Sequence, residues 1–132
     1  MTKPKEQITV FSFGAIAYSM IELFWRNHTH WSMSLTGGAC FSILYNLYQY
    51  FQKLPILGKC TLGSIVITSV EFLVGMIVNV WKKWNVWDYS HLRFNFLGQI
   101  CLLYSVLWFF LSFPIVLVSN QLKRYLKKPL RV

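Results

Sequence analysis

Charged residues are scarce in this chain of 132 residues. Asp and Glu together number only four, and all charged residues make up 13% of the sequence. Soluble domains usually carry about 25% charged residues, so the composition argues against a soluble domain. Hydrophobic residues make up 55% of the chain, which excludes intrinsic disorder. The 13 Lys and Arg sit at the ends of apolar runs, so we expect a membrane surface as their partner and no nucleic acid.

Sequence motifs for catalysis and cofactor binding are also missing. The three cysteines, Cys40, Cys60 and Cys101, have no CxxC spacing, and an odd number cannot all pair within one chain. We interpret them as small buried hydrophobic residues. The sequence contains no HExxH spacing, which would indicate a metal site, and no P-loop, which would indicate nucleotide hydrolysis. It also contains no GxSxG elbow, which would indicate a nucleophile. We therefore predict no cofactor and no metal, and the sequence leaves enzymatic activity undecided.

Long apolar blocks dominate what is present. Each of the four blocks is close to the 20 residues or so that cross a bilayer as a helix. Lipid leaves no partner for unsatisfied backbone groups, so such blocks must be helical. We predict an all-α membrane protein, with four transmembrane helices in a bundle. The single membrane domain spans residues 1–132, with helices at about 8–25, 32–52, 61–81 and 96–118 and a basic cytoplasmic tail at 119–132.

The positions of Lys and Arg predict the orientation. Nine lie in the N-terminal segment, the second connection and the tail, whereas four lie in the other two connections. Both termini are therefore expected on the cytoplasmic side of a multi-pass cell-membrane protein. Aromatic residues agree, because five tryptophans cluster at the proposed outer interface: Trp25, Trp31, Trp81, Trp84 and Trp87.

Two of the four acidic residues, Glu22 and Glu71, fall inside predicted spans. A carboxylate at membrane depth costs several kcal/mol unless it is paired, protonated or facing water. Glu22 lies one turn from Arg26, so a structural ion pair and a functional group are both open interpretations. Glu71 has no cation one turn away, and for it we predict a functional role or a buried network.

Polar residues lie along one face of the predicted first and third helices, toward the proposed outer side. Glu71 and Asn79 are two turns apart on one helix, as are Glu22 and His30 on the other. We predict that Glu71, Asn79, Glu22 and Arg26 face one polar cavity that opens toward the outer loops. The full set of predicted substrate or cavity residues is Glu22, Arg26, His30, Glu71, Asn79, Asp88, His91 and Gln99.

The same residues give the chain a resemblance to a known family. The run Trp87–Ser90, followed by residues 94–101, is the most specific part. Arg93 stands where a proline is expected. Over residues 20–112 the chain resembles the ABC-transporter type IV membrane family, also called CmpB-like. This resemblance implies an integral membrane protein and a permease component. The other matching positions are Glu22, Arg26, Thr29, His30, Trp31, Met33, Gly37, Gly38, Glu71, Gly75, Asn79 and Trp108.

Three functions remain open from the sequence. The first is a permease-type transport component that forms homo-oligomers or joins other membrane subunits and works with a separate ATPase. The second is a scaffold or assembly subunit of a membrane complex. The third is a membrane-embedded enzyme that acts on a lipid-linked substrate. In each case we expect the basic tail, where apolar residues alternate with cations over 121–132, to lie on anionic lipid of the inner leaflet.

Overall fold

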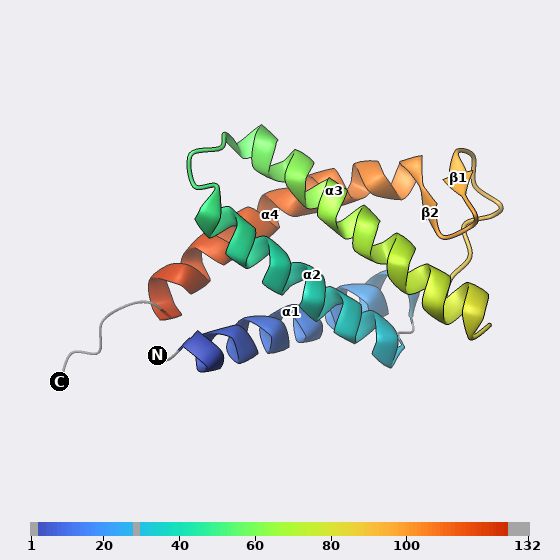
Figure 1. The fold of residues 1–132 in the computed structure, drawn as a ribbon, viewed down its shortest axis with the longest axis horizontal. Coiled ribbons are helices and arrows are strands. Elements are labelled where there is room, and N and C mark those ends of the chain that lie inside the picture. Colours follow the sequence, from blue (N-terminus) through green and yellow to red (C-terminus); the bar gives the residue numbers. More distant parts are fainter. Residues whose placement is uncertain (1–2, 28–29, 127–132) are drawn as a thin grey trace.

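The computed structural model describes residues 3–27 and 30–126, and these form four α-helices (Figure 1). α1 spans Lys3–Arg26 and α2 spans Trp31–Tyr50. α3 spans Ile56–Gly75 and continues as a π-helical segment, η1, over Met76–Trp81. α4 spans Leu102–Leu126, and a short antiparallel hairpin precedes it, with β1 at Asn95–Phe96 and β2 at Ile100–Cys101. The all-α prediction with four helices is confirmed.

Within the described residues, three helical segments combine the length and the hydropathy needed to cross a membrane: Pro4–Arg26, Ile56–Trp81 and Leu102–Leu126. Large apolar side chains on them face outward, including Phe24, Leu73 and Phe110, each more than 60% exposed. So much exposed apolar surface indicates a lipid environment, and the chain is a membrane protein. α2 is 20 residues long and falls outside this group. Its crossing of the membrane remains a prediction.

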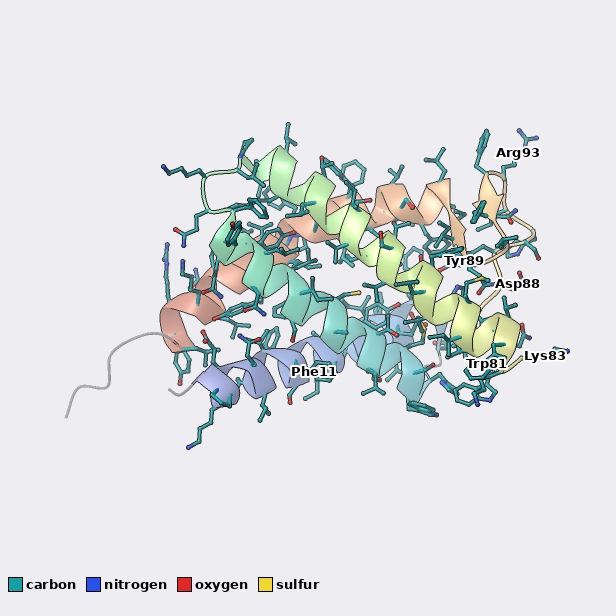
Figure 2. The ribbon with its side chains drawn as sticks, viewed as in Figure 1. Phe11, Trp81, Lys83, Asp88, Tyr89 and Arg93 are labelled. Atoms are coloured by element: carbon teal, nitrogen blue, oxygen red, sulfur yellow. The ribbon has the colours of Figure 1, made fainter. Side chains whose placement is uncertain are left out.

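The two ends of the bundle differ in character. α1 begins, α4 ends and the α2–α3 turn lies at one end, which we call the terminal end (Figure 1). The end of α1, the start of α2 and the segment that follows η1 lie at the opposite end, which we call the loop end (Figure 1). Trp81, Lys83, Asp88 and Tyr89 all lie there, and Arg93 projects from the outermost part of the hairpin segment (Figure 2).

Helix pairs pack through small residues. α1 packs along α2, where Gly14 and Gly37 let the rings of Phe41 and Tyr18 approach the backbone closely. α3 packs along α4, where the Ser64 hydroxyl donates to the Ser105 carbonyl at 2.7 Å. Lipid supplies no hydrophobic drive between helices, so close approach and hydrogen bonds hold such pairs together. The three cysteines are buried and unpaired, as predicted.

Four predicted helix boundaries differ from the structure by five residues or more. α1 begins at Lys3 instead of about residue 8, and α3 begins at Ile56 instead of about residue 61. The fourth helix was expected over 96–118, but residues 96–101 belong to the hairpin, and α4 begins at Leu102. Leu97 and Gly98 have positive φ angles of 55° and 73°, which a helix cannot continue through. At the other end, the predicted tail of 119–132 is helical as far as Leu126. Lys123 and Arg124 lie in this last turn, where cations stabilise the helix dipole. The rest of the tail lies outside the described residues.

Candidate functional site

A crevice runs between α1 and α4, with α2 and α3 at its base. Two adjoining cavities of about 190 and 360 Å³ form it, and Tyr18, Trp87 and Trp108 stand in the walls of both. α1 packs on α2 and α4 packs on α3, so α1 and α4 make few direct contacts. The crevice is the space that these two helix pairs leave between them. Most of its lining is aliphatic or aromatic.

Glu71 lies in the wall of the smaller cavity and is 5% exposed. Its Oε2 accepts a hydrogen bond from the Tyr89 hydroxyl at 3.0 Å, and its Oε1 accepts one from the Trp108 indole nitrogen at 3.3 Å. The Tyr89 ring stacks on Tyr104 with centroids 4.7 Å apart, which holds the phenol in place. Burial raises the pKa of the Tyr89 phenol above its ordinary value, so this hydroxyl keeps its proton and donates. Both carboxylate oxygens therefore have a donor.

Glu22 and Arg26 stand together in the wall of the larger cavity. Arg26 Nη1 lies 3.1 Å from Glu22 Oε1, and Arg26 Nη2 donates to the Val86 carbonyl at 3.2 Å. The second Glu22 oxygen accepts from the Tyr18 hydroxyl at 3.3 Å. The pair thus joins α1 to the segment after η1. Both interpretations of Glu22 remain, because the side chain is ion-paired and also faces the cavity.

Asp88 and His91 stand at the mouth of the same cavity. Asp88 Oδ1 accepts from the Ser90 backbone N–H at 2.9 Å. This bond, with a second from the Ser90 hydroxyl, holds the pKa of the Asp88 carboxyl below its usual range. A Cβ at Gly98 would lie 2.9 Å from Asp88 Oδ1, and its φ of +73° also suits glycine.

Asn79 and Gln99 were predicted in the cavity, but neither stands in the walls of the crevice. The Asn79 amide donates to Gln99 Oε1 at 2.8 Å, and Asn79 Oδ1 accepts from the N–H of Val86 at 2.7 Å. The indole of Trp87 donates to the Gln99 carbonyl at 3.0 Å. These bonds connect η1 to the segment that follows it and to the turn of the hairpin. The two amides hold the segment that carries the crevice residues.

His30 also stands outside the crevice walls. It is the N-cap of α2, where its Nδ1 accepts from the Ser32 backbone N–H at 3.2 Å. Its ring contacts the indoles of Trp31 and Trp84 at centroid distances of 5.4 and 5.8 Å, and the two indoles also contact each other at 5.5 Å. A cap satisfies one of the unpaired N–H groups at a helix start. His30 therefore has a clear structural position at the loop end.

The structure thus brings four of the eight predicted residues to the larger cavity and a fifth, Glu71, to the smaller one next to it: Glu22, Arg26, Asp88, His91 and Glu71. The crevice is apolar along its length and charged at the loop end. Such a site suits a molecule with an apolar body and a polar head. Across residues 3–27 and 30–126, no three His, Cys, Asp or Glu side chains converge as metal ligands would.

A known family matches nearly the whole chain. The sequence profile of the family described as "Putative ABC-transporter type IV" matches residues 2–130. The chain belongs to this family. The match extends past residues 20–112, where the resemblance was expected to end, and takes in all four helices. No solved structure matches the chain.

Three side chains at the site of this ABC-transporter type IV family member were missed as predicted site residues: Tyr18, Tyr89 and Trp108. Tyr18 lies one turn before Glu22 on the same helix face, and that spacing is a signal the sequence does contain. Tyr89 and Trp108 reach Glu71 from 18 and 37 positions away. Only their place among the family-like residues distinguishes them in the sequence. Hydrogen-bond partners this far apart depend on the tertiary structure.

Proposed function

We propose that the chain is a permease-type membrane component of an ABC-type transport system, with the crevice between α1 and α4 as its solute site. The proposal includes a loop end that faces the outer side. Its main support is the crevice itself, an apolar site between two helices that carries charged groups at one end. Family membership supports the same function.

The dimensions and lining of the crevice favour a small-molecule site. Ligand pockets usually measure about 300–1,000 Å³ and combine apolar walls with a few polar groups. The two adjoining cavities together fall in this range. Glu22 and Glu71 supply the buried polar groups, and ionisable residues at membrane depth are typically functional. An amphipathic solute fits this arrangement best.

The chain needs partners to carry out transport. It contains no P-loop sequence, so we propose that ATP is hydrolysed by a separate ATPase subunit. Four helices are also few for enclosing a wide path, which supports assembly with further copies or with other membrane subunits. The exposed apolar faces of α1 and α4 offer surface for such contacts.

The test is a flux assay in proteoliposomes that contain the protein together with the ATPase subunit encoded nearest to it. Fluorescent amphipathic cations and anions serve as solutes, with and without ATP. We expect ATP-dependent flux of at least one solute, and we expect Glu71→Gln to lower that flux at least tenfold. The matched control is Glu6→Gln, because Glu6 is also buried but lies outside the crevice, where it accepts from the Tyr45 hydroxyl at 2.7 Å.

Absence of flux for every solute would contradict the permease function. A scaffold subunit is the second candidate, and the internal hydrogen bonds of Glu71 favour it. In a scaffold, Glu71→Gln would weaken co-purification of the membrane partners, whereas in a permease the assembly would stay intact. The enzyme alternative has less support, because Ser90, Asp88 and His91 lack the hydrogen-bond order of a catalytic triad.

A further inference from the structure

A second pocket lies at the terminal end of the bundle, away from the crevice. It measures about 210 Å³ and lies between the end of α2, the start of α3 and the last turns of α4. In contrast to the crevice, its lining is mostly polar. The residues that matter for its chemistry are Lys59, Lys123, Gln52, Asn120 and Ser119.

The charge of this pocket is positive and uncompensated within its walls. Lys59 and Lys123 both contribute to the lining, and neither Asp nor Glu does. Among the described residues, neither lysine forms an ion pair. Two ammonium groups at one pocket repel each other, and an anion between them removes that repulsion. The pocket therefore favours a ligand with negative charge.

Hydrogen-bond donors surround the same space. Ser119 is 3% exposed, and its hydroxyl makes no hydrogen bond to any described residue. Buried polar groups in proteins almost always have a partner, so this hydroxyl, in a residue of the pocket lining, is a donor that a ligand there can satisfy. Gln52 and Asn120 add amide donors. The Tyr48 hydroxyl donates to the Lys59 carbonyl at 3.0 Å, which ties α2 to the start of α3 beside the lysine.

We infer that this pocket binds a phosphate group, either on the headgroup of an anionic lipid or on a soluble phosphate compound. Two ammonium groups together with hydroxyl and amide donors match an anion with several acceptor oxygens, and charge-assisted bonds of this kind are the strong ones. A single carboxylate would leave part of this donor set without an acceptor. The position at the end of the helices, next to apolar α4 surface, places the phosphate at the depth of lipid headgroups.

Binding is tested on the purified full-length protein by native mass spectrometry, with phosphatidylglycerol and inorganic phosphate as separate probes. We expect one tightly bound phosphatidylglycerol per chain. The double variant Lys59→Gln/Lys123→Gln should weaken binding at least tenfold. The matched control is Lys53→Gln/Arg124→Gln, which removes the same charge from exposed positions at the same end, outside the pocket. It should change the Kd less than about twofold.

Further variants separate the pocket from general charge and from poor folding. Asn120→Asp keeps the side-chain shape and places a carboxylate in the wall, so it should also weaken binding at least tenfold. Ser119→Ala should weaken it several-fold. Binding by inorganic phosphate as tight as by the lipid would identify a soluble phosphate compound as the ligand. Lipid binding more than a hundredfold tighter would identify the headgroup.

Two results would overturn the inference. The first is equal loss in the pocket variant and the control variant, which would mean diffuse attraction to a basic surface. The second is full binding in both the Lys59→Gln/Lys123→Gln and the Asn120→Asp proteins. Neither result depends on flux through the crevice, so this proposal and the transport proposal can fail separately.

Discussion

Individual side chains at the loop end are held by hydrogen bonds that also set their charge. Asp88 is the clearest example, because it is the only aspartate in the sequence and its carboxylate accepts from Ser90. Bonds to the charged form of a carboxyl favour that form. The same bonds close the turn that precedes the hairpin, and Gly98 leaves room for the carboxylate. The ionised state of Asp88 and the shape of this turn therefore depend on each other.

Titration of Asp88 should reflect these bonds. Its carboxyl pKa is lowered in the folded protein, so the stabilisation of the turn is fully present above the unfolded pKa of about 3.9 and is lost as the pH falls through the folded value. Selective ¹³C labelling of aspartate gives one carboxyl signal to follow by NMR. We expect a folded pKa below 3.9 and an upward shift in Ser90→Ala, which loses the hydroxyl bond but keeps the backbone bond. An unchanged pKa in Ser90→Ala would show that the hydroxyl has no part.

Glu71 shows the same principle inside the bundle. Its donors come from the loop segment and from α4, so one side chain joins α3 to two other parts of the fold. Leaving such donors without an acceptor costs about 1–3 kcal/mol for each buried group. This explains how a carboxylate is tolerated in a helix that has no cation one turn away. It also makes the Glu71 side chain a structural as well as a proposed functional residue.

Helix packing depends on glycines at defined positions. Gly38 in α2 faces α1, and a Cβ there would lie 2.9 Å from both the ring and the backbone carbonyl oxygen of Phe11, which is labelled in Figure 2. Gly58, in the first turn of α3, has only ordinary contacts near its own Cβ direction. The two glycines are in helices of equal length, yet they serve different purposes. Gly38 permits close packing of the two helices, whereas the position of Gly58 has room for a larger side chain.

Alanine at these two glycines should therefore have opposite effects. Gly38→Ala forces α1 and α2 apart and should destabilise the protein by about 1–3 kcal/mol, the usual cost of overpacking. Gly58→Ala should stabilise it by up to about 1 kcal/mol, because alanine has the higher helix propensity. Unfolding transitions of both variants in detergent micelles measure the difference. Equal stability of the two variants would contradict the packing role of Gly38.

For the molecule as a whole, the arrangement of the ends bears on its topology. Val10 near the start of α1 and Leu126 at the end of α4 belong to one buried cluster. Two chain ends on one side of a membrane require an even number of crossings. Three helical segments are apolar enough to cross on their own. With both termini predicted on one side, we predict that α2 is the fourth span, packed against α1 and α3.

Reporter fusions test this topology. A green fluorescent protein fused after the last residue should fluoresce, because both termini are predicted to be cytoplasmic. Alkaline phosphatase fused after Trp84, at the loop end, should be active outside. The matched control exchanges the two reporters, and both signals should then disappear. An active phosphatase at the C-terminus would place that end outside and would contradict the predicted topology.

Much of the architecture follows from the sequence because the causes are local. A run of about 20 apolar residues forms a helix in lipid wherever it occurs, so four helices could be predicted from the apolar runs alone. The ion pair of Glu22 and Arg26 follows from their spacing of one helical turn. Burial of the three cysteines was also predictable, because nothing in their spacing requires a bridge or a metal.

Other features depend on contacts that no local pattern encodes. The hairpin at residues 95–101 interrupts an apolar run, because positive φ angles and the bonds of Asn95 to nearby backbone groups outweigh hydropathy there. Asn79 and Gln99 bond to each other across 20 positions and hold the loop end instead of lining the crevice. The crevice exists only because α1 packs on α2 whereas α4 packs on α3. The apolar runs along the chain determine each helix. The pairing of the helices, and with it the site, depends on side chains that meet only in the folded bundle.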